Sequence, residues 1–202
     1  MVLVLAIAAG WVAGLIRSWV RGTTYRVPEF SKAWLVLIAV IPQLLVFQVP
    51  YTASWFSDAW AAGVLVASQL VLLVFIWFNR DKKGVLILGL GLFLNLLVIA
   101  LNRGLMPMTP DTIQALFPEH PISAWLIGSR PGRSKNIILP AGDTRLAWLS
   151  DSLLLPEWFP WTRALSPGDL LVAIGVFWLL AVESQDELSR VKSPVEKSYQ
   201  LK

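Results

Sequence analysis

Two aspartates and one asparagine are placed where a membrane-boundary hydrolase would need them. Asn102 ends a long apolar stretch, Asp151 ends the run 144–151, and Asp169 opens the last apolar stretch. Two carboxyl groups that meet in one site can share a proton, so that one acts as a base toward water and the other as an acid toward a leaving group. Asp151 and Asp169, together with Asn102, are therefore candidate catalytic residues of an aspartyl hydrolase.

Helix capping accounts for the same aspartates without catalysis. Ser166 suits the N-cap of a helix, Pro167 suits its first position, and Asp169 stands at the third position. There a carboxylate bonds back to the N-cap and interacts favourably with the helix dipole. Asp151 can likewise cap a turn or pair with a nearby arginine. Both interpretations of the aspartates stay open.

The basic run 128–135 is a second candidate site. It superficially resembles a phosphate-binding loop, but its spacing is one residue short and no predicted strand precedes it, which excludes a nucleotide site. Arg130, Arg133 and Lys135 can instead clamp a lipid phosphate, because arginine binds phosphate through two parallel hydrogen bonds. A solvated basic turn is the alternative.

One helical face carries small and polar residues inside an apolar stretch. Gly84, Gly91, Asn95 and Asn102 recur at helical intervals. Glycine allows a neighbouring helix to approach closely, and a buried asparagine can hydrogen-bond across the contact. The pattern predicts helix packing through Gly91 and Asn95.

Residues that hold most cofactors are missing from the chain. It has no cysteine and a single histidine, His120, which excludes disulfides, thiolate nucleophiles and the usual two-histidine metal sites. We therefore expect neither a metal nor a cofactor. The net charge of +4 is small and not gathered in one stripe, so we expect no nucleic-acid partner.

The elements that must position these residues are predicted to lie in a membrane. The chain is 56% apolar and only 15% charged, against about 25% charged residues in soluble domains. The composition predicts an all-α, polytopic membrane bundle of about five transmembrane helices. Four apolar stretches fall within 1–102, and a fifth helix is expected at 166–183. The predicted spans cover 2–16, 33–49, 59–78, 85–101 and 170–182, the last extended back to Ser166.

Basic residues alternate between the connections. They follow the first and third stretches and are missing between the second and third. The positive-inside rule then places the N-terminus outside, the C-terminus in the cytoplasm, and 103–165 on the outer side. This tryptophan-containing segment is predicted to form an interfacial outer cap of short helices and turns, including one that begins with Thr109 as N-cap. Residues 184–202 are predicted to be a polar cytoplasmic tail.

Three of these runs, in this order, resemble a known family. The run that begins at Asn102, the run that ends at Asp151, and Ser-Pro-Gly-Asp at 166–169 followed by Leu-Leu-Val-Ala-Ile-Gly are similar to domain-of-unknown-function (DUF) family 5317. The resemblance covers roughly residues 95–180 and implies a bacterial multi-spanning membrane protein with no established activity.

A fainter likeness is to the lipoprotein signal peptidases. Asn102-Arg103-Gly104, Asp151 and Asp169 occupy the order of that family's motifs, which implies an aspartyl enzyme. This chain lacks the two full spans that those enzymes have between the first two motifs. It also lacks their asparagine before the last aspartate.

We expect a non-enzymatic binding or assembly component of the bacterial inner membrane. Its expected partners are membrane lipids and, in a complex, other membrane proteins. One alternative is an intramembrane aspartyl hydrolase acting on a lipid-linked substrate. Another is a carrier of small molecules or lipids.

Overall fold

The computed structural model describes residues 2–49, 55–132, 134–156, 159 and 164–183. The predicted tail, 184–202, lies outside the described residues, and so does Arg133.

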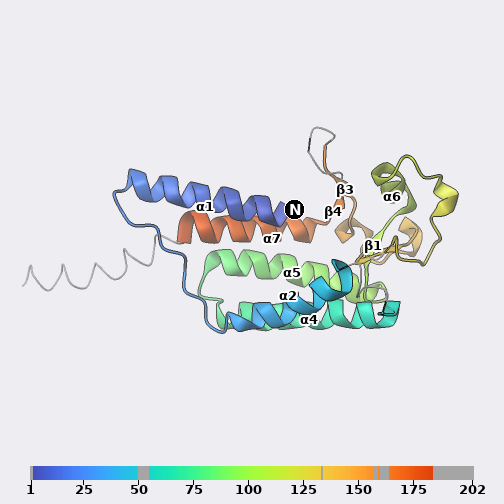
Figure 1. Ribbon diagram of the computed structural model, residues 1–202, viewed down its shortest axis with the longest axis horizontal. Coiled ribbons are helices and arrows are strands. Elements are labelled where there is room, and N and C mark those ends of the chain that lie inside the picture. Colours follow the sequence, from blue (N-terminus) through green and yellow to red (C-terminus); the bar gives the residue numbers. More distant parts are fainter. Residues whose placement is uncertain (1, 50–54, 133, 157–158, 160–163, 184–202) are drawn as a thin grey trace, which may run out of the picture.

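Five apolar helices of the described chain run side by side along the long axis of the molecule (Figure 1). Three of them, α1, α4 and α5, are long and apolar enough to cross a membrane. A fourth, α2, is a shorter apolar helix, and α7 continues into a single π-helical turn at Leu179–Glu183. Their bounds are α1 Val2–Val20, α2 Trp34–Phe47, α4 Asp58–Phe78, α5 Lys83–Leu101 and α7 Pro167–Trp178.

Glycines bring α5 and α7 into the most extensive contact between helices. A Cβ atom built on Gly91 would lie 2.5 Å from the carbonyl oxygen of Gly168, and one on Gly84 would lie 2.8 Å from that of Gly175. Only a residue without a side chain fits such distances. Through Gly10, α1 packs against α7 at Phe177 and against the following π-helical turn at Leu180.

The segment between α5 and α7, residues 103–165, forms a cap at one end of the helices (Figure 1). Strand β1 (Met106–Met108) pairs in parallel with β2 (Asn136–Ile138), so that Met106 lies opposite Asn136. Helix α6 (Pro110–Leu116) begins at Thr109, whose side chain accepts a hydrogen bond from the backbone of Thr112. Strands β3 (Leu153–Leu154) and β4 (Ala164–Leu165) form an antiparallel pair. Short 3₁₀ turns lie at Ile122–Ala124, Ala141–Asp143 and Ala147–Leu149.

The structure is mostly helical, as predicted, but the cap contains two short sheets that the sequence analysis did not predict. Strands of two or three residues are too short to show an alternating pattern. A continuous hydrophobic cluster joins the cap to the ends of α4 and α5. It consists of Leu65, Val98, Ile99, Leu105, Met106, Ile137, Leu139 and Leu149.

Candidate functional site

Lys135 lies between the two aspartates at the junction of the cap and the helices. Its ammonium nitrogen is 3.4 Å from Oδ2 of Asp151 and 3.6 Å from Oδ2 of Asp169. The three residues come from separate segments: Lys135 directly precedes β2, Asp151 follows the 3₁₀ turn Ala147–Leu149, and Asp169 lies in the first turn of α7. This cluster, called the Asp-Lys-Asp cluster below, therefore ties the cap to α7.

An asparagine holds each carboxylate of the cluster. The Nδ2 of Asn136 donates to Oδ2 of Asp151 at 2.8 Å, and the Nδ2 of Asn95 donates to Oδ1 of Asp169 at 2.8 Å. The hydroxyl of Ser166 in turn donates to Oδ1 of Asn95 at 2.8 Å. Because the amide of Asn95 is bonded on both sides, it holds the carboxylate of Asp169 in a fixed orientation.

Asp169 also completes a capping box at the start of α7. Its backbone N–H donates to the hydroxyl of Ser166 at 3.0 Å, and its carboxylate accepts from the backbone N–H of Ser166 at 3.3 Å. The side chain of Asp169 therefore caps its helix and binds Lys135 at the same time, so capping does not exclude a second role.

Burial and charge act in opposite directions on the cluster. The side chain of Asp151 is only 3% exposed, and burial raises its pKa while the ammonium of Lys135 opposes that rise. Burial alone would lower the pKa of Lys135, but the two carboxylates together raise it above the ordinary lysine value. Lys135 therefore stays charged, and the cluster carries one net negative charge when both carboxyls are ionised.

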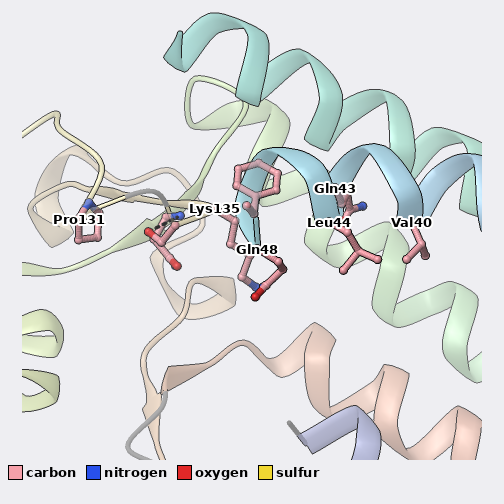
Figure 2. Close-up of a pocket in the computed structure, with 9 residues that line it drawn as sticks. Val40, Gln43, Leu44, Gln48, Pro131 and Lys135 are labelled. Carbon is pink, nitrogen blue, oxygen red and sulfur yellow. Dashed lines mark hydrogen bonds between the residues drawn. The ribbon is translucent and has the colours of Figure 1, made fainter. Parts of the chain in front are cut away.

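Two pockets lie on either side of the segment that carries Lys135. The first has a volume of about 470 Å³ and lies between α2 and the cap (Figure 2). Its helix side is Val40, Gln43, Leu44, Phe47 and Gln48, and its cap side is Pro131, Ser134, Lys135 and Asn136. The second has a volume of about 720 Å³, shares these four cap residues, and extends beneath α6. Its apolar wall is Met108, Ile113, Leu116, Phe117 and Trp125.

Asn102 serves a different part of the structure. Its Nδ2 donates to the carbonyl oxygens of Val98 and Arg145, at 2.7 and 2.8 Å, and its Oδ1 accepts from the backbone N–H of Arg145 at 3.0 Å. None of these bonds reaches Asp151 or Asp169. Asn102 therefore fixes the backbone of the cap at the end of α5.

The basic run is held by carboxylates. The guanidinium of Arg130 is 3.0 Å from Asp58 at the start of α4, donates through Nε to the carbonyl oxygen of Ser134, and lies over the ring of Phe47. Lys135 contacts the two aspartates described above. Because both cations already face carboxylates, they attract a phosphate less strongly than the sequence suggests. The phosphate clamp stays a prediction.

Gly91 and Asn95 lie on the face of α5 that contacts α7. Asn95 is 4% exposed and bonds to both Ser166 and Asp169.

Asn136 was not singled out in the sequence, because a single asparagine in a three-residue strand has no helical spacing to indicate a role. Its position next to Lys135 was the one available signal. Among the described residues, no group of three His, Asp or Glu side chains is placed to hold a metal ion.

Long apolar helices and a cap joined to them by an ion cluster define the class of protein: a mostly helical chain with candidate membrane spans. The model of the DUF5317 family, a family of unknown function, matches residues 28–181, and the chain belongs to this family. An uncharacterized protein of Thermotoga maritima is 28% identical over 156 residues, which cover 73% of this chain and 80% of that protein. No solved structure matches the chain.

Proposed function

We propose that the chain is a multi-pass protein of the bacterial inner membrane. In this proposal the helices α1, α2, α4, α5 and α7 cross the membrane. Its N-terminus and cap lie outside and its C-terminus lies in the cytoplasm. The short connections 21–33 and 79–82, which contain Arg21, Arg26, Lys32, Arg80 and Lys82, lie at the end of the helices opposite the cap (Figure 1). This separation supports an orientation with the basic connections in the cytoplasm.

Within this membrane protein, the proposed activity is non-enzymatic binding of an amphiphile, such as a membrane lipid, at the junction of α2 and the cap. The observation that carries the proposal is the composition of the pocket in Figure 2. Val40, Leu44 and Phe47 offer an apolar wall on α2, and Ser134, Lys135 and Asn136 offer hydrogen-bonding groups on the cap. A pocket of a few hundred cubic ångströms with a few convergent polar groups is typical of ligand sites.

The surroundings of Lys135 indicate the chemistry of the head group. The ammonium is already balanced by Asp151 and Asp169, so the cluster does not attract a strongly anionic group. The side chain of Lys135 is nevertheless 37% exposed and can donate to a polar neighbour. An uncharged or zwitterionic head with hydrogen-bond acceptors fits this wall better than a phosphate alone.

Filling the pocket tests the proposal. Leu44→Trp adds a large side chain to the apolar wall and is expected to reduce lipid that co-purifies in mild detergent, as measured by native mass spectrometry. Leu45→Trp is the matched control, because Leu45 is 44% exposed on the same helix, close to the 47% of Leu44, and does not line the pocket. Equal retention of lipid by the two variants and the unmodified protein would contradict amphiphile binding at this site.

The meeting of Asp151 and Asp169 at one ammonium favours one second candidate, the aspartyl hydrolase, because two carboxyl groups in one site can divide the acid and base roles. The proximity of Lys135 weighs against it, since the ammonium supplies the positive charge that a shared proton would otherwise provide. If the chain is a hydrolase, cleavage of a lipid-linked substrate is abolished by Asp151→Asn while lipid retention is kept. If it only binds, no cleavage by the unmodified protein is detected.

A further inference from the structure

Two arginines line a third pocket, away from the Asp-Lys-Asp cluster. The pocket has a volume of about 550 Å³ and lies where α5 ends and the cap begins. Arg103 and Arg145 both contribute to its wall, together with Gly128 and Ile127. Neither of the two other pockets contains any of these residues.

The backbone around both arginines is held in unusual conformations. Arg103 has a φ of 61°, in the left-handed region that non-glycine residues seldom adopt, and Leu146, directly after Arg145, has a φ of 54°. Asn102 fixes the peptide groups on both sides of Arg145 through the two hydrogen bonds already described. Residues held in such strained conformations gather at ligand sites, where the surrounding structure imposes them.

The guanidinium of Arg103 lies against a loop of the cap. A Cβ atom built on Gly128 would lie 3.4 Å from Nη1 of Arg103, and Gly128 itself has a φ of 82°. The left-handed φ favours glycine at position 128, where a Cβ atom would be in ordinary van der Waals contact with the guanidinium. Asn102 and Gly128 together position the two arginines at one pocket.

Within the described residues, neither guanidinium forms an ion pair or a hydrogen bond. Asp143 also lines the pocket, and among the described residues no ion pair joins its carboxylate to either arginine. The three side chains together carry one net positive charge. This pair differs from Arg130 and Lys135, which carboxylates already bind.

Exposed apolar side chains lie in or next to the segments that line the pocket. Leu126 is 70% exposed and Ile127 is 64% exposed, and Leu101, at the last turn of α5, is 39% exposed. Large apolar side chains exposed next to two arginines are typical of the boundary between hydrocarbon and lipid head groups. The apolar residues fit acyl chains, and the arginines fit an anion.

From this arrangement we infer that Arg103 and Arg145 form a site for the phosphate of a phospholipid head group at the cap end of the bundle. Guanidinium groups bind phosphate oxygens through paired, charge-assisted hydrogen bonds. The site is separate from the pocket proposed for the amphiphile, so each can exist without the other.

A soluble short-chain phospholipid tests the assignment. Binding of dioctanoyl phosphatidylglycerol to the full chain in detergent is measured by native mass spectrometry, beside dioctanoylglycerol and inorganic phosphate. We expect the phospholipid to bind, and Arg145→Gln and Arg103→Asn each to weaken it about tenfold, the loss typical of one hydrogen bond to a charged group. Asparagine is chosen at position 103 because it tolerates the left-handed conformation.

Two controls separate this site from other causes. Arg21 follows the last residue of α1, at the end of the helices away from the cap. Arg21→Gln removes the same charge there and should leave phospholipid binding unchanged. Leu44→Trp should also leave it unchanged, which distinguishes failure of this inference from failure of the amphiphile proposal. Equal binding of dioctanoylglycerol, inorganic phosphate that binds as tightly as the phospholipid, or unchanged binding in both arginine variants at an unchanged thermal midpoint would each overturn the inference.

Discussion

At the scale of single residues, Lys135 is expected to stabilise the junction of the cap and the helices. Its ammonium separates two carboxylates that would otherwise repel each other at the base of the cap. Removing one partner of a buried ion pair leaves an uncompensated charge, which costs about 3–5 kcal/mol when burial is complete. Because Lys135 is 37% exposed, water screens part of that penalty.

Lys135→Met should therefore destabilise the protein by about 2 kcal/mol, a value reduced from the fully buried case. The measurement is the thermal midpoint of the purified protein in detergent. Adding Asp151→Asn to Lys135→Met removes one of the unbalanced charges and should recover part of the loss. A double variant less stable than Lys135→Met would contradict this account of the cluster.

The same cluster predicts how stability changes with pH. The folded protein raises the pKa of Lys135, so its contribution is complete below the ordinary lysine value of about 10.4 and is lost as the pH rises above it. The thermal midpoint should fall above that pH, and part of this fall should be missing in Lys135→Met. An identical alkaline decline in both proteins would show that Lys135 does not interact with the carboxylates as described.

At the scale of elements, the contact between α5 and α7 depends on glycine. Gly91→Ala would place a methyl group 2.5 Å from the carbonyl oxygen of Gly168, so the helices must separate, at a cost of about 1–3 kcal/mol. Gly63→Ala in α4 is the matched control, because no heavy atom lies within 4 Å of its added methyl group. Thermal midpoints in detergent should fall for Gly91→Ala and change little for Gly63→Ala, and the reverse order would contradict the packing.

Local signals in the sequence were enough to predict several elements. Ser166 and Asp169, and Thr109 with Pro110, follow capping patterns that depend only on neighbouring residues, and both caps are present. The face of α5 that carries glycine and asparagine was predictable from the sequence, because these residues recur at helical intervals. These local signals were enough to predict the long helices and the residues that begin α6 and α7.

The cluster itself could not be predicted, because its residues are far apart in sequence. Lys135 looked like part of a basic loop suited to phosphate, and nothing local indicated that Asp151 and Asp169 would both face it. The parallel pairing of β1 with β2 brings the segment before Asn136 beside the end of α5. That pairing depends on long-range contacts, which a three-residue strand does not reveal.

At the scale of the whole molecule, the absence of cysteine from the sequence makes the proposed orientation easy to test. Thr24→Cys places a thiol in the connection after α1, and Ser123→Cys places one in the cap; both positions are exposed. In intact cells, a membrane-impermeant maleimide should label Ser123→Cys, and should label Thr24→Cys only after the membrane is opened. Labelling in the opposite pattern would reverse the topology.

The glycine-lined contact of α5 with α7 also bears on how the protein is made. The two helices are separated by the whole cap, so a ribosome must synthesise more than sixty further residues after α5 before its partner emerges, which takes several seconds or more at about 5–20 residues per second. During that interval Asn95 has neither Ser166 nor Asp169 to bond with. A nascent chain stalled before α7 would therefore lack both side chains that hold this amide in the folded protein.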